Sequence, residues 1–109
     1  MTDVDVIDFE KASRETLRWL IMATLNAARP LGAAEPLILS AISGIPHRVT
    51  ALELRRELSY LEERGLILIP PSSKESPVWH ARLTRAGVDV VEYTVACDAG
   101  IARPRKYWV

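Results

Sequence analysis

The sequence of 109 residues predicts an α+β domain, mostly α, in which three core helices precede a two-stranded hairpin and a last helix. Three observations support this prediction. A stretch without Gly or Pro covers residues 9–29, a capping-box pattern begins at Thr50, and two short apolar runs follow at 66–69 and 78–83. A hydrophobic content of 49% suffices for one domain, with its core at about 9–95, an N-terminal tail at 1–8 and a C-terminal tail at 96–109.

The first predicted helix has Asp8 as its N-cap and runs to Arg29, where Pro30 stops it. Residues 1–8 alternate acidic and aliphatic side chains, which favours a frayed tail over a short strand. Two sides of this helix are apolar enough to be buried, which predicts a central helix or one that forms a dimer. Apolar residues at three-and-four spacing form one side, and further apolar residues fill the other: Leu17, Leu20, Ile21, Thr24 and Ala28, then Trp19, Met22, Ala23 and Leu25.

A connector at 31–34 leads into a second, short and apolar helix. Glu35 and Pro36 mark its start, because Pro fits the first helical turn and lacks only a donor that the helix does not use. Its end is predicted at 43–46, where Gly44 permits a left-handed C-cap.

The third helix carries the clearest local signals. Thr50 is the expected N-cap, and Glu53 stands three residues later at the capping-box spacing. An apolar stripe of Leu54, Leu58 and Leu61 follows, and Gly65 is the expected C-cap.

The remaining elements are a hairpin and a fourth helix. The aliphatic run 66–69 and the run 78–83 are expected to pair, with polar turn residues at 72–76 between them. Thr84 begins the last helix, which is predicted to reach Val95 with Gly87 as a weak point inside it.

This order of elements resembles the winged helix-turn-helix superfamily. The run from Leu54 to Ile67, Leu-x-x-x-Leu-x-x-Leu-Glu-Glu-Arg-Gly-Leu-Ile, is similar to the end of a recognition helix that runs into the first wing strand. The stretch from Leu83 to Val88 looks like the return from the wing, which in relatives of the MarR, PadR and ArsR kind often reads Leu-Thr-x-x-Gly. The short single-domain design is also similar to small winged-helix proteins of bacteriophages and Mu-like prophages.

The resemblance implies a duplex DNA-binding protein, expected to be a transcriptional regulator. Helix 50–64 would enter the major groove, and the 70–77 wing would lie on the backbone. Arg55 or Arg56 could bind a guanine with two hydrogen bonds, although ion pairs with Glu53, Glu57, Glu62 and Glu63 are the alternative. The implied DNA contacts are Arg48, Thr50, Arg55, Arg56, Ser59, Tyr60, Lys74 and Arg82.

The C-terminal tail combines positive charge with aromatic rings in Arg103, Arg105, Lys106, Tyr107 and Trp108. This composition suits contact with phosphate and stacking on a base. The alternative, which we favour, is that the tail docks on its own domain or on a neighbouring subunit, because large aromatic side chains at a chain end usually anchor packing.

The overall charge argues against a strongly basic nucleic-acid binder. The chain has 14 Lys plus Arg against 14 Asp plus Glu. Residues 47–109 carry ten basic and eight acidic side chains, whereas residues 1–46 carry four and six. The basic bias of the second half is small, so the phosphate contacts of a DNA-binding form would have to come from the tail or from a homodimer. The expected homodimer is joined through the first helix, the last helix and the tail. The acidic third helix keeps a protein-interaction adaptor without DNA binding as the alternative function.

The sequence offers little for an enzyme or a cofactor site. Cys97 is the lone cysteine, and His47 and His80 stand apart from it and from each other, so neither a disulfide nor a metal site is expected. No phosphate-binding loop or nucleophile motif is present. The N-terminus lacks a secretion signal and no segment is apolar enough to span a membrane, so the expected compartment is the cytoplasm.

Overall fold

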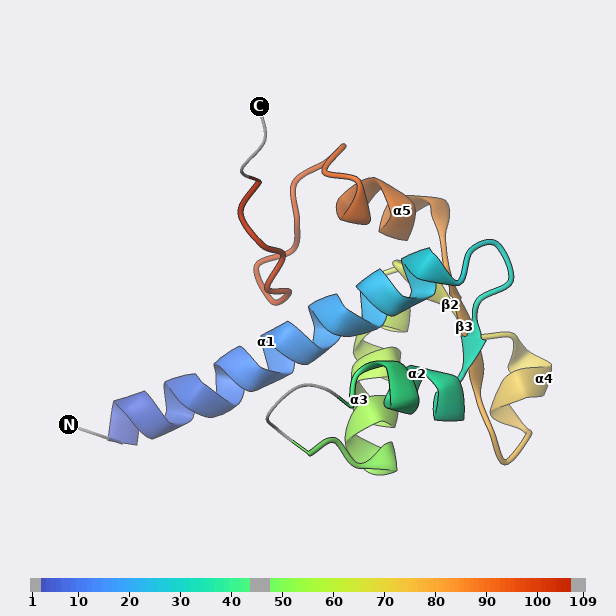
Figure 1. Cartoon of the computed structure of the whole chain (residues 1–109), viewed down its shortest axis with the longest axis horizontal. Helices are drawn as coiled ribbons and strands as arrows, with labels where there is room; N and C mark the ends of the chain where they lie inside the picture. Colours follow the sequence, from blue (N-terminus) through green and yellow to red (C-terminus); the bar gives the residue numbers. More distant parts are fainter. Residues whose placement is uncertain (1–2, 44–47, 107–109) are drawn as a thin grey trace.

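The computed structural model describes residues 3–43 and 48–106, with side chains from residue 8 onward. It has an α+β fold that is mostly helical, as predicted, with a small antiparallel sheet (Figure 1). The elements follow in the order α1 (Asp3–Ala27), β1 (Ala33–Ala34), α2 (Glu35–Ala41), α3 (Ala51–Glu63), β2 (Ile67–Leu68), α4 (Pro71–Lys74), β3 (His80–Leu83) and α5 (Arg85–Val91).

Helix α1 is longer than predicted. It begins at Asp3, so a tail over residues 3–8 and an N-cap at Asp8 are both wrong. No Gly or Pro interrupts this stretch, and its acidic residues suit the positive end of the helix dipole. The helix crosses the molecule, and its N-terminal half extends beyond the other elements (Figure 1). Ile21, Met22 and Leu25 are fully buried, so this same chain covers both apolar sides.

The sheet has three strands in the order β1-β3-β2, where two were predicted. Strand β3 is central and antiparallel to both neighbours, with Ala33 opposite Ala81 and Ile67 opposite Leu83. The predicted hairpin therefore exists, but it is extended by β1 from the connector before α2. Two alanines carry no alternating pattern, and only their pairing with β3 makes them a strand.

Helices α2 and α3 match their local signals. Thr50 accepts a hydrogen bond from the Glu53 amide, and the Glu53 carboxylate accepts one from the Thr50 amide, which completes the predicted capping box. Arg64 is the C-cap of α3, and the predicted glycine follows it: Gly65 adopts φ +74°, the left-handed conformation that commonly ends a helix. The predicted C-cap at Gly44 lies outside the described residues. The core is built mainly from Leu17, Ile21, Met22, Leu25, Ile38, Leu54, Leu58, Leu61 and Ile67.

The segment between β2 and β3 and the last helix both differ from the prediction. The expected polar turn contains the one-turn helix α4, which two prolines initiate. Helix α5 ends at Val91 instead of Val95, and Tyr93 takes φ +63° beyond it. Gly87 is a close-packing position in α5 instead of a weak point, because a Cβ there would overlap the carbonyl oxygen of Leu66.

Residues 97–106, which we name the C-terminal strap, pack across α1 and α5. Ile101 is buried, and the Ala102 amide donates to the carbonyl of Glu15 at 3.0 Å. Arg103 Nη1 donates to the carbonyls of Val90 and Val95, each at 2.9 Å. The strap thus docks on its own domain, while Tyr107 and Trp108 of the predicted tail lie outside the described residues.

Candidate nucleic-acid interface

Helix α3 presents one side to solvent that we name the outer stripe: Leu52, Arg56, Ser59 and Glu63. These positions recur at helical spacing opposite the buried Leu54, Leu58 and Leu61. Arg56 is exposed, and the structure shows no hydrogen bond or ion pair between it and another described residue. Its guanidinium group can therefore reach a ligand without breaking an internal contact.

Arg55, the neighbour of Arg56, is held against the protein surface by internal contacts. Its Nε and Nη2 atoms donate to the two carboxylate oxygens of Glu35 at 2.8 and 2.6 Å, and its guanidinium lies 4.4 Å from the ring centre of Trp79. The hydrogen bonds from Arg55, with help from the Trp79 amide, lower the pKa of Glu35 although its burial acts in the opposite direction. The ion-pair alternative therefore holds for Arg55, but with a partner on α2 instead of its own helix.

Tyr60 lies on the side of α3 that faces the C-terminal strap. The guanidinium carbons of Arg18 and Arg64 stand 3.5 and 3.7 Å from its ring centre. Arg64 also pairs with Asp98 of the strap at 2.8 Å. A hydrogen bond from the Gly100 amide, followed by those from Arg64 and Tyr60, lowers the pKa of Asp98. Tyr60 is thus part of the attachment of the strap, away from the outer stripe.

The other predicted DNA contacts also divide into residues with an internal role and residues that remain exposed. Lys74 pairs with Glu62 at 2.6 Å, which ties α4 to α3, and Thr50 serves as the helix cap. Ser59 is half-buried on the outer stripe. Three of the predicted basic contacts remain exposed with no internal partner among the described residues: Arg48 before α3, Arg56 on α3 and Arg82 on β3.

Several important residues were missed by the sequence analysis. The Arg18–Glu57 pair joins α1 to α3 with 2.6 Å between Nε and Oε1, and both side chains are largely buried. Glu35 is also buried, as the acceptor for Arg55. Sequence spacing could reveal neither the Arg18–Glu57 pair nor the Arg55–Glu35 pair, because each pair joins two separate elements. Leu52 of the outer stripe could have been found, since it stands four residues before Arg56.

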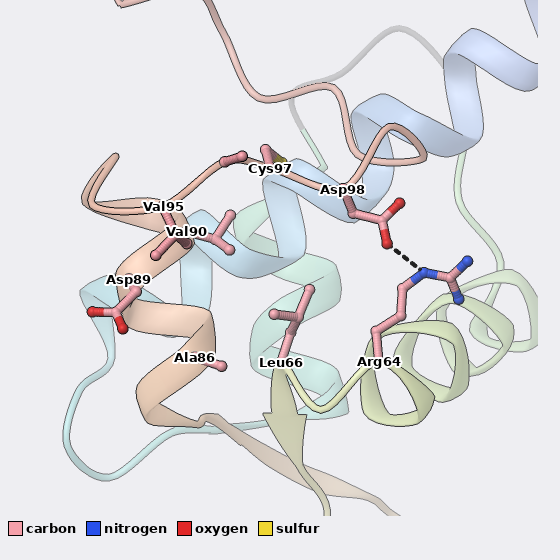
Figure 2. Close-up of a pocket in the computed structure, with 9 residues that line it drawn as sticks. Arg64, Leu66, Ala86, Asp89, Val90, Val95, Cys97 and Asp98 are labelled. Atoms are coloured by element: carbon pink, nitrogen blue, oxygen red, sulfur yellow. Dashed lines mark hydrogen bonds and ion pairs between the residues drawn. The ribbon is translucent and has the colours of Figure 1, made fainter.

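A hollow of about 470 Å³ lies between α5, the start of β2 and residues 95–98 (Figure 2). Figure 2 shows Asp98 turned toward Arg64, with Leu66 and Val90 at the wall. Burial raises the pKa of the Cys97 thiol, which disfavours the reactive thiolate. Among the side chains that the structure describes, within residues 8–43 and 48–106, no three form a set that could hold a metal ion. The hollow is thus lined mainly by apolar side chains, with Arg64, Asp89 and Asp98 beside them.

Comparisons with protein-family models, with curated proteins and with solved structures find no match to this chain. No helix in the described part of the chain has the length and apolar character needed to cross a membrane.

Proposed function

We propose that this chain is a winged helix-turn-helix protein that binds duplex DNA and acts as a transcriptional regulator. In this proposal α3 enters the major groove, and the unit β2–α4–β3 is the wing beside the backbone. The strand order β1-β3-β2, with α2 and α3 inserted between β1 and β2, supports the resemblance drawn from the sequence. The observation that carries the proposal is the outer stripe, on which Arg56 is exposed while Arg55 is held by Glu35.

The outer stripe has the chemistry to read base edges. A major groove accommodates one α-helix, and an arginine can make two hydrogen bonds to guanine, worth about 1 to 3 kcal/mol of discrimination. This role would fall to Arg56. Leu52, which stands one turn earlier and is 61% exposed, offers an apolar contact for a thymine methyl group.

The exposed cations set the expected strength of phosphate binding. If Arg48 and Arg82 each neutralise one phosphate while Arg56 reads a base, the slope of log affinity against log salt is about −1.8 per chain. Affinity would then fall roughly 12-fold between about 50 and 200 mM salt. Lys74 and Arg55 do not contribute to the slope, because Glu62 and Glu35 already neutralise them.

A titration of fluorescent duplex fragments, of random sequence and from the source genome, at about 50 and 200 mM salt tests the proposal. We expect saturable binding with the slope given above, and preference for particular fragments. Arg56→Ala should weaken the preference for particular fragments by about 1 to 3 kcal/mol and leave the slope nearly unchanged. Arg14→Ala, which removes an exposed arginine on α1, is the matched control and should leave binding unchanged. Absence of binding by the folded protein at low salt would refute the proposal.

A protein-interaction adaptor is the second candidate. Two exposed leucines favour it: Leu52 on α3 is 61% exposed, and Leu37 on α2 is 57% exposed. DNA offers few apolar contacts, whereas a protein partner could cover both side chains. A folded protein that shows no DNA affinity, but whose partner binding is lost in Leu52→Ser, would support this candidate.

A further inference from the structure

The N-terminal part of α1 carries an exposed aromatic ring. We name residues 3–14 the α1 arm, which extends beyond the other elements in Figure 1. Phe9 is 69% exposed, and its neighbours Asp8 and Glu10 are exposed as well. A large aromatic side chain held on a rigid helix away from the core is typical of an interaction surface.

The α1 arm and the end of the C-terminal strap carry opposite charges. The α1 arm contains four acidic side chains, all within residues 3–10, against two basic ones, Lys11 and Arg14. Residues 103–106 contain three basic side chains and no acidic one, and of these Arg103 is held by the carbonyls of Val90 and Val95. Both segments lie toward the same side of the molecule in Figure 1. Two copies of the chain can therefore bring an acidic arm to a basic strap twice, once in each direction.

A groove beside the strap has the size and composition to receive an aromatic ring. Its volume is about 600 Å³. Apolar and polar atoms of the strap and of the preceding turn line it in similar measure, with three basic side chains and one acidic side chain, Asp98, among them. The lining includes Ala96, Cys97, Ile101, Pro104, Arg105 and Lys106.

The arm cannot fill the groove of its own chain. The carbonyl of Glu15 already accepts a hydrogen bond from Ala102 of the strap. Phe9 stands six residues earlier, about 9 Å further along a straight helix. The ring consequently remains exposed within one chain.

We propose that Asp8, Phe9 and Glu10 of one copy bind the strap groove of a second copy, and that the exchange is reciprocal. The Phe9 ring enters the groove, and the two carboxylates face Arg105. Each copy gives one arm and receives one, so the contact closes as a twofold homodimer and leaves no free arm for a third chain.

The oligomeric state of the full chain tests the proposal. Sedimentation equilibrium at about 50 mM salt should give twice the chain mass of 12.2 kDa, with dissociation favoured at about 500 mM salt. Phe9→Ser should raise the dimer dissociation constant at least about tenfold. Leu31→Ser, which alters a side chain that is 79% exposed elsewhere, is the matched control. A monomer at about 200 µM, or a dimer that Phe9→Ser leaves unchanged, overturns the proposal.

A charge-exchange experiment is the decisive test of the proposal. Asp8→Arg with Glu10→Arg, and separately Arg105→Glu with Lys106→Glu, should each give a monomer with unchanged circular dichroism. An equimolar mixture should restore the dimer, because both contacts then join opposite charges. A mixture that stays monomeric overturns the assignment of these two surfaces to each other.

Discussion

The buried pair of Arg18 and Glu57 predicts a non-additive pattern of stability. Their side chains are only 13% and 9% exposed, so removal of either partner leaves a charge with little access to water. Glu57→Leu should lower the free energy of unfolding by about 3 kcal/mol, which shifts the melting temperature by about 12 °C in a domain of this size. Arg18→Met should cost about 4 kcal/mol, because it also removes the hydrogen bond to the Gly100 carbonyl and the stack on Tyr60.

The double variant separates the buried charges from simple loss of packing. With both charges gone, only the Gly100 and Tyr60 contacts are missing, so the expected loss is about 1 to 2 kcal/mol, less than for either single variant. Urea unfolding followed by circular dichroism measures all three. The control is Lys11→Met, which breaks the exposed ion pair of Lys11 with Glu15 at 3.9 Å on α1. It should lower the free energy of unfolding by less than about 0.5 kcal/mol. Additive losses in the double variant would refute the reasoning.

Three further predictions concern packing, acid and capping. Gly87→Ala should lower the free energy of unfolding by about 1 to 3 kcal/mol in urea titrations despite the better helix propensity of alanine, and a gain in stability would contradict the packing against Leu66. The pKa of Glu35 and of Asp98 is lowered by folding, so their contribution to stability is complete above the ordinary carboxyl range and is lost as pH falls through the depressed folded values. Thermal melts below about pH 4.5 should therefore fall less steeply for Glu35→Gln than for the unmodified chain, and parallel curves would speak against this source of acid sensitivity. Thr50→Ala should cost about 1 kcal/mol, seen as a lower melting temperature, whereas an unchanged melt would show that the capping box adds nothing measurable.

The helices with local end signals were predictable from the sequence, and the elements defined by distant partners were not. Thr50 and Glu53 stabilise the start of α3 over three residues, so their pattern is visible in the chain itself. Strand β1 has no such pattern, because Ala33 and Ala34 become a strand only beside β3. The start of α1 was misplaced because Asp8 suits an N-cap and a position inside the acidic first turns equally well.

The candidate interface was predictable as a helix but not as a set of side chains. Arg55 and Arg56 are identical in type, and about 100° of helix rotation separates them. This rotation turns one toward Glu35 and leaves the other exposed. The stripe of Leu54, Leu58 and Leu61 gives the orientation of α3, but the acidic partner on α2 is visible only in the folded chain.

The attachment of the strap has a consequence for synthesis of the chain. Arg18 and its acceptor Gly100 are 82 residues apart, so α1 leaves the ribosome long before the segment that helps to hold it exists. Contacts between distant parts of a chain form late, because closing a large loop costs entropy before any contact forms. Until then the apolar sides of α1 are without their final neighbours. The nascent protein should accordingly depend on chaperones during elongation and reach its native packing only after residues 97–106 have emerged.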